Sequence, residues 1–102
     1  MAKLDKHHRI LIPKNILKIA NTDFSKELRL YQHGMDFYID NPLPENRRVL
    51  CFGTITINDK GRFVVPKVAR DVLGLKANDN ITCFLLNDKA TFRKVFFIPE
   101  NR

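Results

Sequence analysis

The chain contains an internal repeat, and this feature constrains its fold more than any other. At an offset of 53 residues, residues 4–14 align with residues 57–67 without a gap. Residue class is kept further along the same register, where apolar residues continue to match apolar residues. The repeat indicates one small unit present twice, and we expect the two units to share one core as a pseudo-twofold pair. The identical residues in these stretches are Arg9 and Arg62, Pro13 and Pro66, and Lys14 and Lys67.

Each copy predicts a polar turn, a short apolar strand and then a short helix. Pro13 and Pro66 suit the first helical position, because proline has a preset φ and no N–H to donate. The helices are expected to end near Asn21 and Gly74, two residue types that tolerate the left-handed conformation. The apolar stripes expected to face the core are Ile16, Leu17, Ile19 and Ala20 in the first helix, and Val68, Ala69, Val72 and Leu73 in the second.

A β-hairpin is expected after each helix, with turns at His33-Gly34 and at Asn87-Asp88. The expected strands of these hairpins are 27–32 with 35–40, and 80–86 with 89–97, and a further strand is expected at 49–57. This order divides the chain into a first unit (1–40), a polar linker with two prolines (41–48) and a second unit (49–97). Each unit is strand–strand–helix–strand–strand, so the fold class is mostly β with short helices.

The chain is basic, with 18 Lys and Arg against 11 Asp and Glu, for a net charge of +7 over 102 residues. Both halves carry part of this excess, which predicts a folded basic surface that attracts polyanions. No apolar run is long enough for a membrane span, so we expect a cytoplasmic, nucleoid-associated protein without membrane contact. Cys51 and Cys83 are expected to be free, buried thiols.

The residues give little support for catalysis or for a cofactor. His7 and His8 are adjacent in a turn, but no His or Cys spacing of a structural zinc site is present. Ser25 is the only serine, and no glycine-rich phosphate loop occurs. We therefore expect no enzyme, no bound metal and no cofactor. Nine aromatic residues are expected to fill the core: Phe24, Phe37, Tyr38, Phe52, Phe63, Phe84, Phe92, Phe96 and Phe97.

The segment from Asn58 to Leu75 resembles the signature of the AbrB/MazE/SpoVT family. It has a turn that ends in Gly61-Arg62, a run of aliphatic residues, Pro66, and a short helix that ends in Leu73-Gly74. The first unit is a degenerate copy, with His8 in place of the glycine. Membership implies a swapped-hairpin β-barrel in which two tandem units form one barrel over residues 1–102. It also implies a bacterial or archaeal transcription regulator, or an antitoxin that represses its own operon.

The resemblance gives Arg62, Arg70 and Arg9 the roles of DNA contacts in the turns and the second helix. Leu17 stands at the position equivalent to Arg70, so that contact is absent from the first unit, and Lys18 is its expected substitute. Asp71 stands where relatives often have a second arginine, which weakens the local positive field. The cations that flank the two strand–helix junctions, and that we expect to bind double-stranded DNA, are Arg9, Arg62, Arg70, Lys14, Lys67, Lys18, Lys6 and Lys60.

Two other functions stay open from the sequence. An antitoxin would bind a toxin as its partner, although only about five residues follow Phe97, where such proteins usually carry a long tail. A protein–protein interaction module with a decayed DNA face is the second alternative, because the first unit lacks several residues of the pattern. A homodimer of full chains also stays open.

Overall fold

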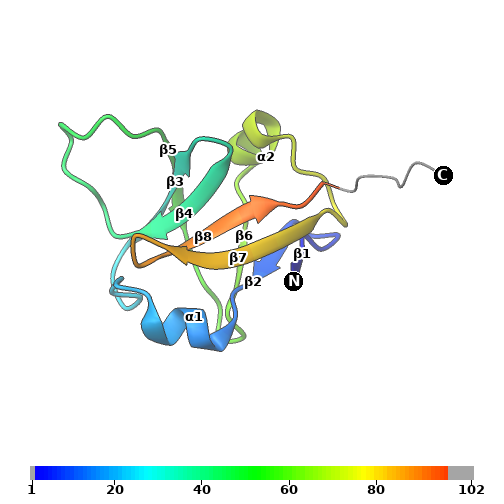
Figure 1. Ribbon diagram of the computed structural model, residues 1–102, viewed down its shortest axis with the longest axis horizontal. Coiled ribbons are helices and arrows are strands. Elements are labelled where there is room, and N and C mark those ends of the chain that lie inside the picture. Colours follow the sequence, from blue (N-terminus) through cyan, green and yellow to red (C-terminus); the bar gives the residue numbers. More distant parts are fainter. Residues whose placement is uncertain (1, 97–102) are drawn as a thin grey trace.

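The computed structural model describes residues 2–96 and is mostly β, with two short helices (Figure 1). A six-stranded antiparallel sheet has the order β1-β7-β8-β4-β3-β5, and β2 and β6 form a separate two-stranded sheet. Neither helix is long and apolar enough to cross a membrane. The strands are β1 (Ala2–Lys3), β2 (Arg9–Leu11), β3 (Leu28–His33), β4 (Asp36–Asp40), β5 (Cys51–Ile55), β6 (Arg62–Val64), β7 (Asn80–Leu86) and β8 (Lys89–Lys94), and the helices are α1 (Lys14–Ile19) and α2 (Lys67–Leu73).

The strands pair across the two halves of the sequence in a pattern that repeats the 53-residue offset. Ala2 of β1 lies opposite Ile81 of β7. The repeat equivalents of these residues, Ile55 of β5 and Leu28 of β3, lie opposite each other in the same way. The first strand of each half therefore joins the hairpin of the other half.

Two cross-strand pairs show where the pseudo-twofold axis passes. Ile10 lies opposite Phe63 in the β2–β6 pair, and Tyr38 lies opposite Thr91 in the β4–β8 pair. In both pairs a residue meets its own repeat equivalent, 53 positions away. Only an axis that passes through both pairs relates the two halves in this manner.

The strands do not close into the single barrel expected from the sequence. The six-stranded sheet has two edges, β1 and β5, and the β2–β6 ribbon is a sheet of its own. Proline explains why the ribbon is short, since Pro13 and Pro66 follow two residues after its strands and have no N–H to extend a ladder. At the other end, β1 is only two residues long and covers a small part of β7.

The helix ends differ between the two halves. Both prolines lie at the N-cap, one position before the first helical residue and not at that residue as expected, with extended ψ angles of 140° and 148°. Gly74 ends α2 in the left-handed conformation as expected, with φ of 65°. α1 also ends near Asn21 as expected, but without a left-handed residue: its C-cap is Ala20 with φ of −58°, and the Asn21 N–H donates to Asp88 O.

Both hairpins form, with small differences from the expected boundaries. The first turn lies at Gly34-Met35, one residue later than expected, because His33 pairs with Asp36. The second turn is at Asn87-Asp88, where φ angles of 51° and 64° fit a type I′ turn. The last strand ends at Lys94, and Phe97 lies outside the described residues.

The core joins the ribbon to the large sheet through aromatic contacts. The Phe92 ring lies 5.2 Å from the Phe37 ring and 5.3 Å from the Phe63 ring, and all three side chains are buried. Some expected core positions are wrong. The short helices bury only one face, and Phe96 and Cys51 lie outside the core. The exposed residues are Ile19, Val68, Val72, Phe96 and Cys51.

Candidate nucleic-acid interface

The β2–β6 ribbon presents one face to the core and one face outward. Successive residues of a strand point to opposite sides, so Ile10 and Phe63 are buried while their neighbours point away from the core. The register places Arg9 opposite Val64, and Leu11 opposite Arg62. The four outward side chains of this ribbon face are Arg9, Leu11, Arg62 and Val64.

Two matching turns hold the start of each ribbon strand. Asp5 Oδ1 accepts hydrogen bonds of 2.8 Å from the N–H groups of His7 and Arg9. Asn58 Oδ1 accepts the equivalent bonds from Lys60 and Arg62, at 3.0 and 2.9 Å. Asp and Asn form such side-chain turns readily, and this is why the polar turns expected from the sequence are present in both halves.

The turns also explain the glycine in one half and its replacement in the other. Gly61 has φ of 80°, and a Cβ added there would lie 3.4 Å from Ile12 O. His8 occupies the equivalent position and adopts φ of 62°, which is uncommon for a residue with a side chain. The degenerate first unit therefore keeps the backbone conformation of the second unit, at an energetic cost.

Each turn lies beside the helix of the other half. His8 O accepts a hydrogen bond of 2.9 Å from the N–H of Val65, which directly precedes α2. The Ile12 N–H, just before α1, donates an equivalent 2.9 Å bond to Gly61 O. Each end of the ribbon therefore combines cations from both halves: Lys6, Arg9, Lys67 and Arg70 at one end, and Lys60, Arg62, Lys14 and Lys18 at the other.

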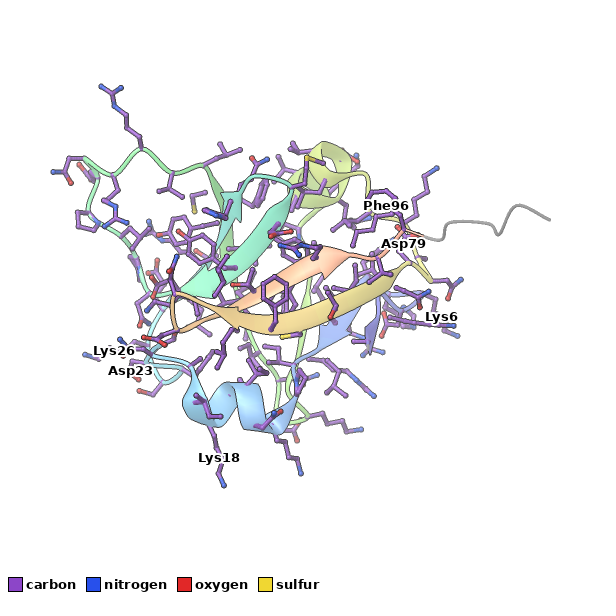
Figure 2. All side chains as sticks on the ribbon, viewed as in Figure 1. Lys6, Lys18, Asp23, Lys26, Asp79 and Phe96 are labelled. Atoms are coloured by element: carbon purple, nitrogen blue, oxygen red, sulfur yellow. The ribbon has the colours of Figure 1, made fainter. Side chains whose placement is uncertain are left out.

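All eight cations expected from the sequence lie on the ribbon, its turns or the two helices. The lysines are exposed, and Figure 2 shows Lys6 and Lys18 extending into solvent from turn and helix on different sides of the molecule. The arginines are half-buried. The expectation that both junctions serve one surface therefore holds for Arg9 and Arg62, whereas Lys6 and Lys18 extend toward its margins.

Carboxylates make the two ends of the ribbon unequal. Arg9 Nε donates to Asp5 Oδ2 at 2.9 Å, while Arg62 makes no ion pair with any residue in the range 2–96. Burial opposes ionisation of Asp5, but the hydrogen bonds from Arg9 and His7 outweigh it and lower its pKa. Asp5 therefore stays charged and holds Arg9 in place, whereas the guanidinium of Arg62 is available to an anion.

The helix cations are also constrained. Lys67 Nζ donates to Asp71 Oδ2 at 2.8 Å, and this bond lowers the pKa of Asp71. Arg70 Nε donates to Val65 O at 3.2 Å, which turns the guanidinium back toward the end of the ribbon. In the first unit the equivalent Leu17 packs against the core, and Lys18 is exposed. Asp71 thus forms an ion pair with the lysine one turn before it on the same helix.

Two exposed aliphatic residues were not expected at this surface. Leu11 is 46% exposed and Val64 is 54% exposed, and they alternate with the arginines along the ribbon face. The spacing Arg-x-Leu and Arg-x-Val in the sequence predicts that these aliphatic residues lie beside the arginines, because residues two apart on a strand share one face. The ribbon face is therefore a mixed surface of guanidinium and methyl groups.

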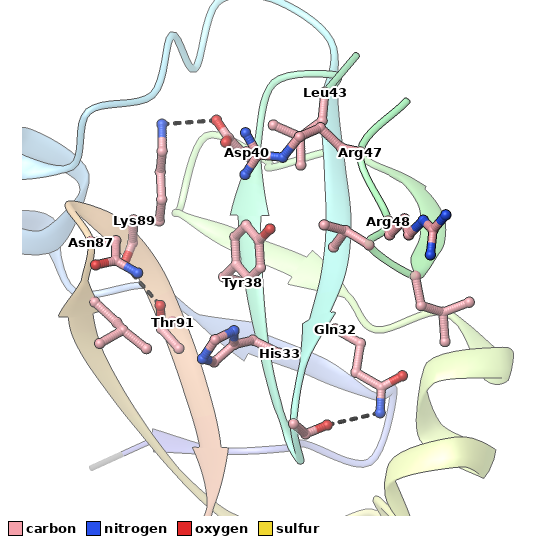
Figure 3. A pocket seen from close by; sticks show the side chains of 14 residues that line it. Gln32, His33, Tyr38, Asp40, Leu43, Arg47, Arg48, Asn87, Lys89 and Thr91 are labelled. Atoms are coloured by element: carbon pink, nitrogen blue, oxygen red, sulfur yellow. Dashed lines mark hydrogen bonds and ion pairs between the residues drawn. The ribbon is translucent and has the colours of Figure 1, made fainter. Parts of the chain in front are cut away.

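A pocket among the described residues lies elsewhere and is lined by none of the eight cations. It is an open groove of about 730 Å³ between the outer face of the β4–β8 pair and the segment after β4 (Figure 3). Tyr38 and Thr91 form part of its floor, and Arg47 and Arg48 lie at its rim. No group of three or more His, Cys, Asp or Glu side chains suited to a metal occurs within residues 2–96.

Comparisons with protein-family models, with curated proteins and with solved structures find no match to this chain.

Proposed function

We propose that the protein is a sequence-preferring, double-stranded DNA-binding transcriptional regulator of AbrB type, and that the ribbon face is its DNA contact. The observation that carries the proposal is the register of β2 and β6, which places Arg9 and Arg62 on one outward face around a pseudo-twofold axis. Duplex DNA has the same kind of local symmetry, and symmetric proteins commonly bind half-sites related by it.

The exchange of strands between the two halves supports a swapped-hairpin fold. In a swapped-hairpin arrangement the first strand of one unit completes the hairpin of the other unit. The β1–β7 and β5–β3 pairs have this form. We therefore propose an open variant of the swapped-hairpin fold, assembled from two tandem units within one chain.

The ribbon face suits a DNA groove chemically. The major groove admits a two-stranded β-ribbon, and an arginine there can bind a phosphate and can also donate two hydrogen bonds to a guanine edge. Leu11 and Val64 offer methyl groups for contact with thymine methyls. The exposed lysines of the turns and helices would neutralise phosphates and fix the register of the protein on the duplex.

The inequality of the two ends implies an asymmetric footprint. Arg62 is open to an anion, while Arg9 is held by Asp5. Arg70 has no cationic equivalent in the first unit, where Leu17 stands. The second unit should therefore make the stronger half of the contact, and the target need not be a perfect palindrome.

Fluorescence anisotropy with labelled duplexes tests this proposal. We expect the protein to bind its own upstream region more tightly than random duplex. The Arg9→Ala, Arg62→Ala double variant should bind at least about tenfold more weakly at 0.1 M salt. Arg47→Ala, Arg48→Ala is the matched control, because it removes the same charge from the exposed linker, away from the ribbon. Equal losses in both double variants, or no binding at low salt, would contradict the proposal and favour a protein partner.

A further inference from the structure

The pseudo-twofold symmetry leaves one sheet edge uncovered. On β3, the residues from Leu28 to Tyr31 pair with β5, and the Gln32 N–H donates to Leu50 O at 2.9 Å. The equivalent strand β7 pairs with β1 only at Asn80 and Ile81. No strand within residues 2–96 covers the rest of this edge.

The open part of the edge presents backbone groups that a strand can pair with. In an antiparallel ladder alternate residues direct their N–H and C=O groups to opposite sides. The residues that flank the two-residue turn, Leu86 and Lys89, form a hydrogen-bonded pair. Every second residue back along β7 therefore also bonds to β8, which gives Phe84 and Thr82. Cys83 and Leu85 therefore direct their backbone groups to the open edge. They are the repeat equivalents of Leu30 and Gln32, which face β5.

Side chains along this edge are less buried than at the equivalent edge of β3. Cys83 and Leu85 lie opposite Phe92 and Ala90, two residues with no exposed surface, so their side chains point to the core side of the sheet. They are nevertheless only partly buried. Leu30, the equivalent of Cys83, is fully buried.

Phe52 shows what covers the equivalent edge. It lies in β5 between Cys51, opposite Tyr31, and Gly53, opposite Leu30, and is 5% exposed. In the other half this place is a pocket of about 340 Å³. The residues that line the pocket are Ala2, Lys3, Leu11, Pro13, Thr82 and Cys83. Their equivalents at the 53-residue offset include Leu30 and Ile55, which lie in the same β3–β5 pair as Phe52.

We propose that the β7 edge is a docking site for an extended segment of a partner protein. The segment pairs antiparallel with Cys83 and Leu85 and inserts one bulky apolar side chain into the pocket, as Phe52 does in the other half. Main-chain bonds supply affinity in this mode of recognition, and the pocket supplies specificity. The pocket shares Leu11 with the ribbon face, but the observations behind this proposal do not depend on DNA binding.

A second copy of the chain is a poorer occupant. Its β5 strand already pairs with its own β3, and its Phe52 is buried there. Pairing β5 of one copy onto β7 of the next would also be a head-to-tail contact, which builds a ring or an open chain of copies and not a twofold dimer. We therefore assign the segment to a different protein.

A synthetic peptide of residues 47–53 carrying Cys51→Ser is the probe, since this segment covers β3 in the intact chain. We expect saturable binding to the protein, with amide shift changes in NMR spectra and hydrogen-exchange protection at Cys83 and Leu85. The same peptide with Phe52→Ala should bind at least about tenfold more weakly, because the alanine side chain is too small to fill the pocket. N-methylation at Leu50, whose C=O accepts the hydrogen bond from Gln32 in the intact chain, places a methyl group at the paired edge and should abolish binding. The same change at Val49, which faces away, is the matched control.

Three results would overturn the proposal. The first is absence of saturable binding at millimolar peptide. The second is binding that perturbs Leu28 to Gln32 instead, because the peptide would then be replacing β5. The third is a concentration-dependent dimer that protects the β7 edge without peptide, since a second copy would then occupy the site.

Discussion

At the scale of single residues, the two halves solve the same local problems with different side chains. Position 8 is histidine in one half and its equivalent, position 61, is glycine in the other, yet both have positive φ. Position 5 is aspartate and position 58 is asparagine, yet both accept the same backbone hydrogen bonds. Each difference therefore offers a substitution that converts one half toward the other.

His8→Gly should stabilise the protein, and Gly61→Ala should destabilise it. The left-handed conformation costs a residue with a Cβ roughly 1–2 kcal/mol, and glycine avoids this cost. The gain at position 8 should be about 1 kcal/mol after the greater freedom of glycine in the unfolded chain is counted. Gly61→Ala brings the same strain, while its added methyl group would lie at an ordinary contact distance of 3.4 Å from Ile12 O. Urea unfolding followed by circular dichroism measures both changes, and a loss of stability in His8→Gly would refute this view of the turn.

Asp5→Asn should raise the affinity for DNA. Asparagine keeps the acceptor that Asn58 uses in the second half, so the turn should persist, but it removes the carboxylate that holds Arg9. We expect the affinity for duplex DNA to rise about threefold or more at 0.1 M salt, since the substitution removes one negative charge from the ribbon face. Anisotropy with the upstream duplex measures the effect, and Asp23→Asn, a similar exposed Asx position away from the ribbon, is the control. Equal gains in both variants would show that net charge alone is responsible.

At the scale of elements, the β2–β6 ribbon has one face that packs against the large sheet and an opposite face that we propose binds DNA. Phe63 is 1% exposed and contacts Phe92 of the large sheet, whereas its neighbour Val64 is 54% exposed. Substitutions at adjacent positions of one strand should therefore affect different properties.

Phe63→Ala should lower the free energy of unfolding by about 3–5 kcal/mol, because it leaves a cavity between the two sheets. Val64→Ala should change it by less than about 0.5 kcal/mol, as is usual at exposed positions. Val64→Ala should nevertheless weaken DNA binding by removing methyl contacts from the ribbon face. Urea unfolding and anisotropy on both variants check these outcomes, and a stability loss from Val64→Ala equal to that from Phe63→Ala would contradict the assigned faces.

The elements were largely predictable from the sequence, and their ends and exposed faces were less so. The repeat with its Arg, Pro and Lys positions predicts both strand–helix units and both hairpins, because turn residues and apolar runs act locally. The exposure of Ile19, Val68 and Val72 was not predictable, since helices of six and seven residues bury fewer positions than a longer stripe suggests. The Asp5–Arg9 ion pair depends on side-chain rotamers, which spacing alone does not fix.

At the scale of the whole molecule, strand pairing makes the two halves interdependent. Four pairs of strands, β1–β7, β2–β6, β3–β5 and β4–β8, cross between the halves, while only the hairpins pair within one half. Neither half should therefore hold a stable core alone.

Division of the chain between Pro44 and Glu45 tests this interdependence. Each fragment alone should be largely unfolded by circular dichroism, because it loses four of its strand pairings. An equimolar mixture should regain β structure and unfold cooperatively, with a 1:1 mass in solution. A second-half fragment that folds cooperatively by itself would show that the halves are independent domains.

The measurement that tests the central claim most directly is the salt dependence of DNA binding. With about six phosphate contacts, log K should fall against log[salt] with a slope near −5. Arg9→Ala, Arg62→Ala should make this slope shallower by about 2, since each lost contact contributes about 0.9, and the linker control Arg47→Ala, Arg48→Ala should leave it unchanged. A flat slope in the unmodified protein, or equal slopes in it and in the Arg9→Ala, Arg62→Ala variant, would contradict a DNA-binding ribbon face.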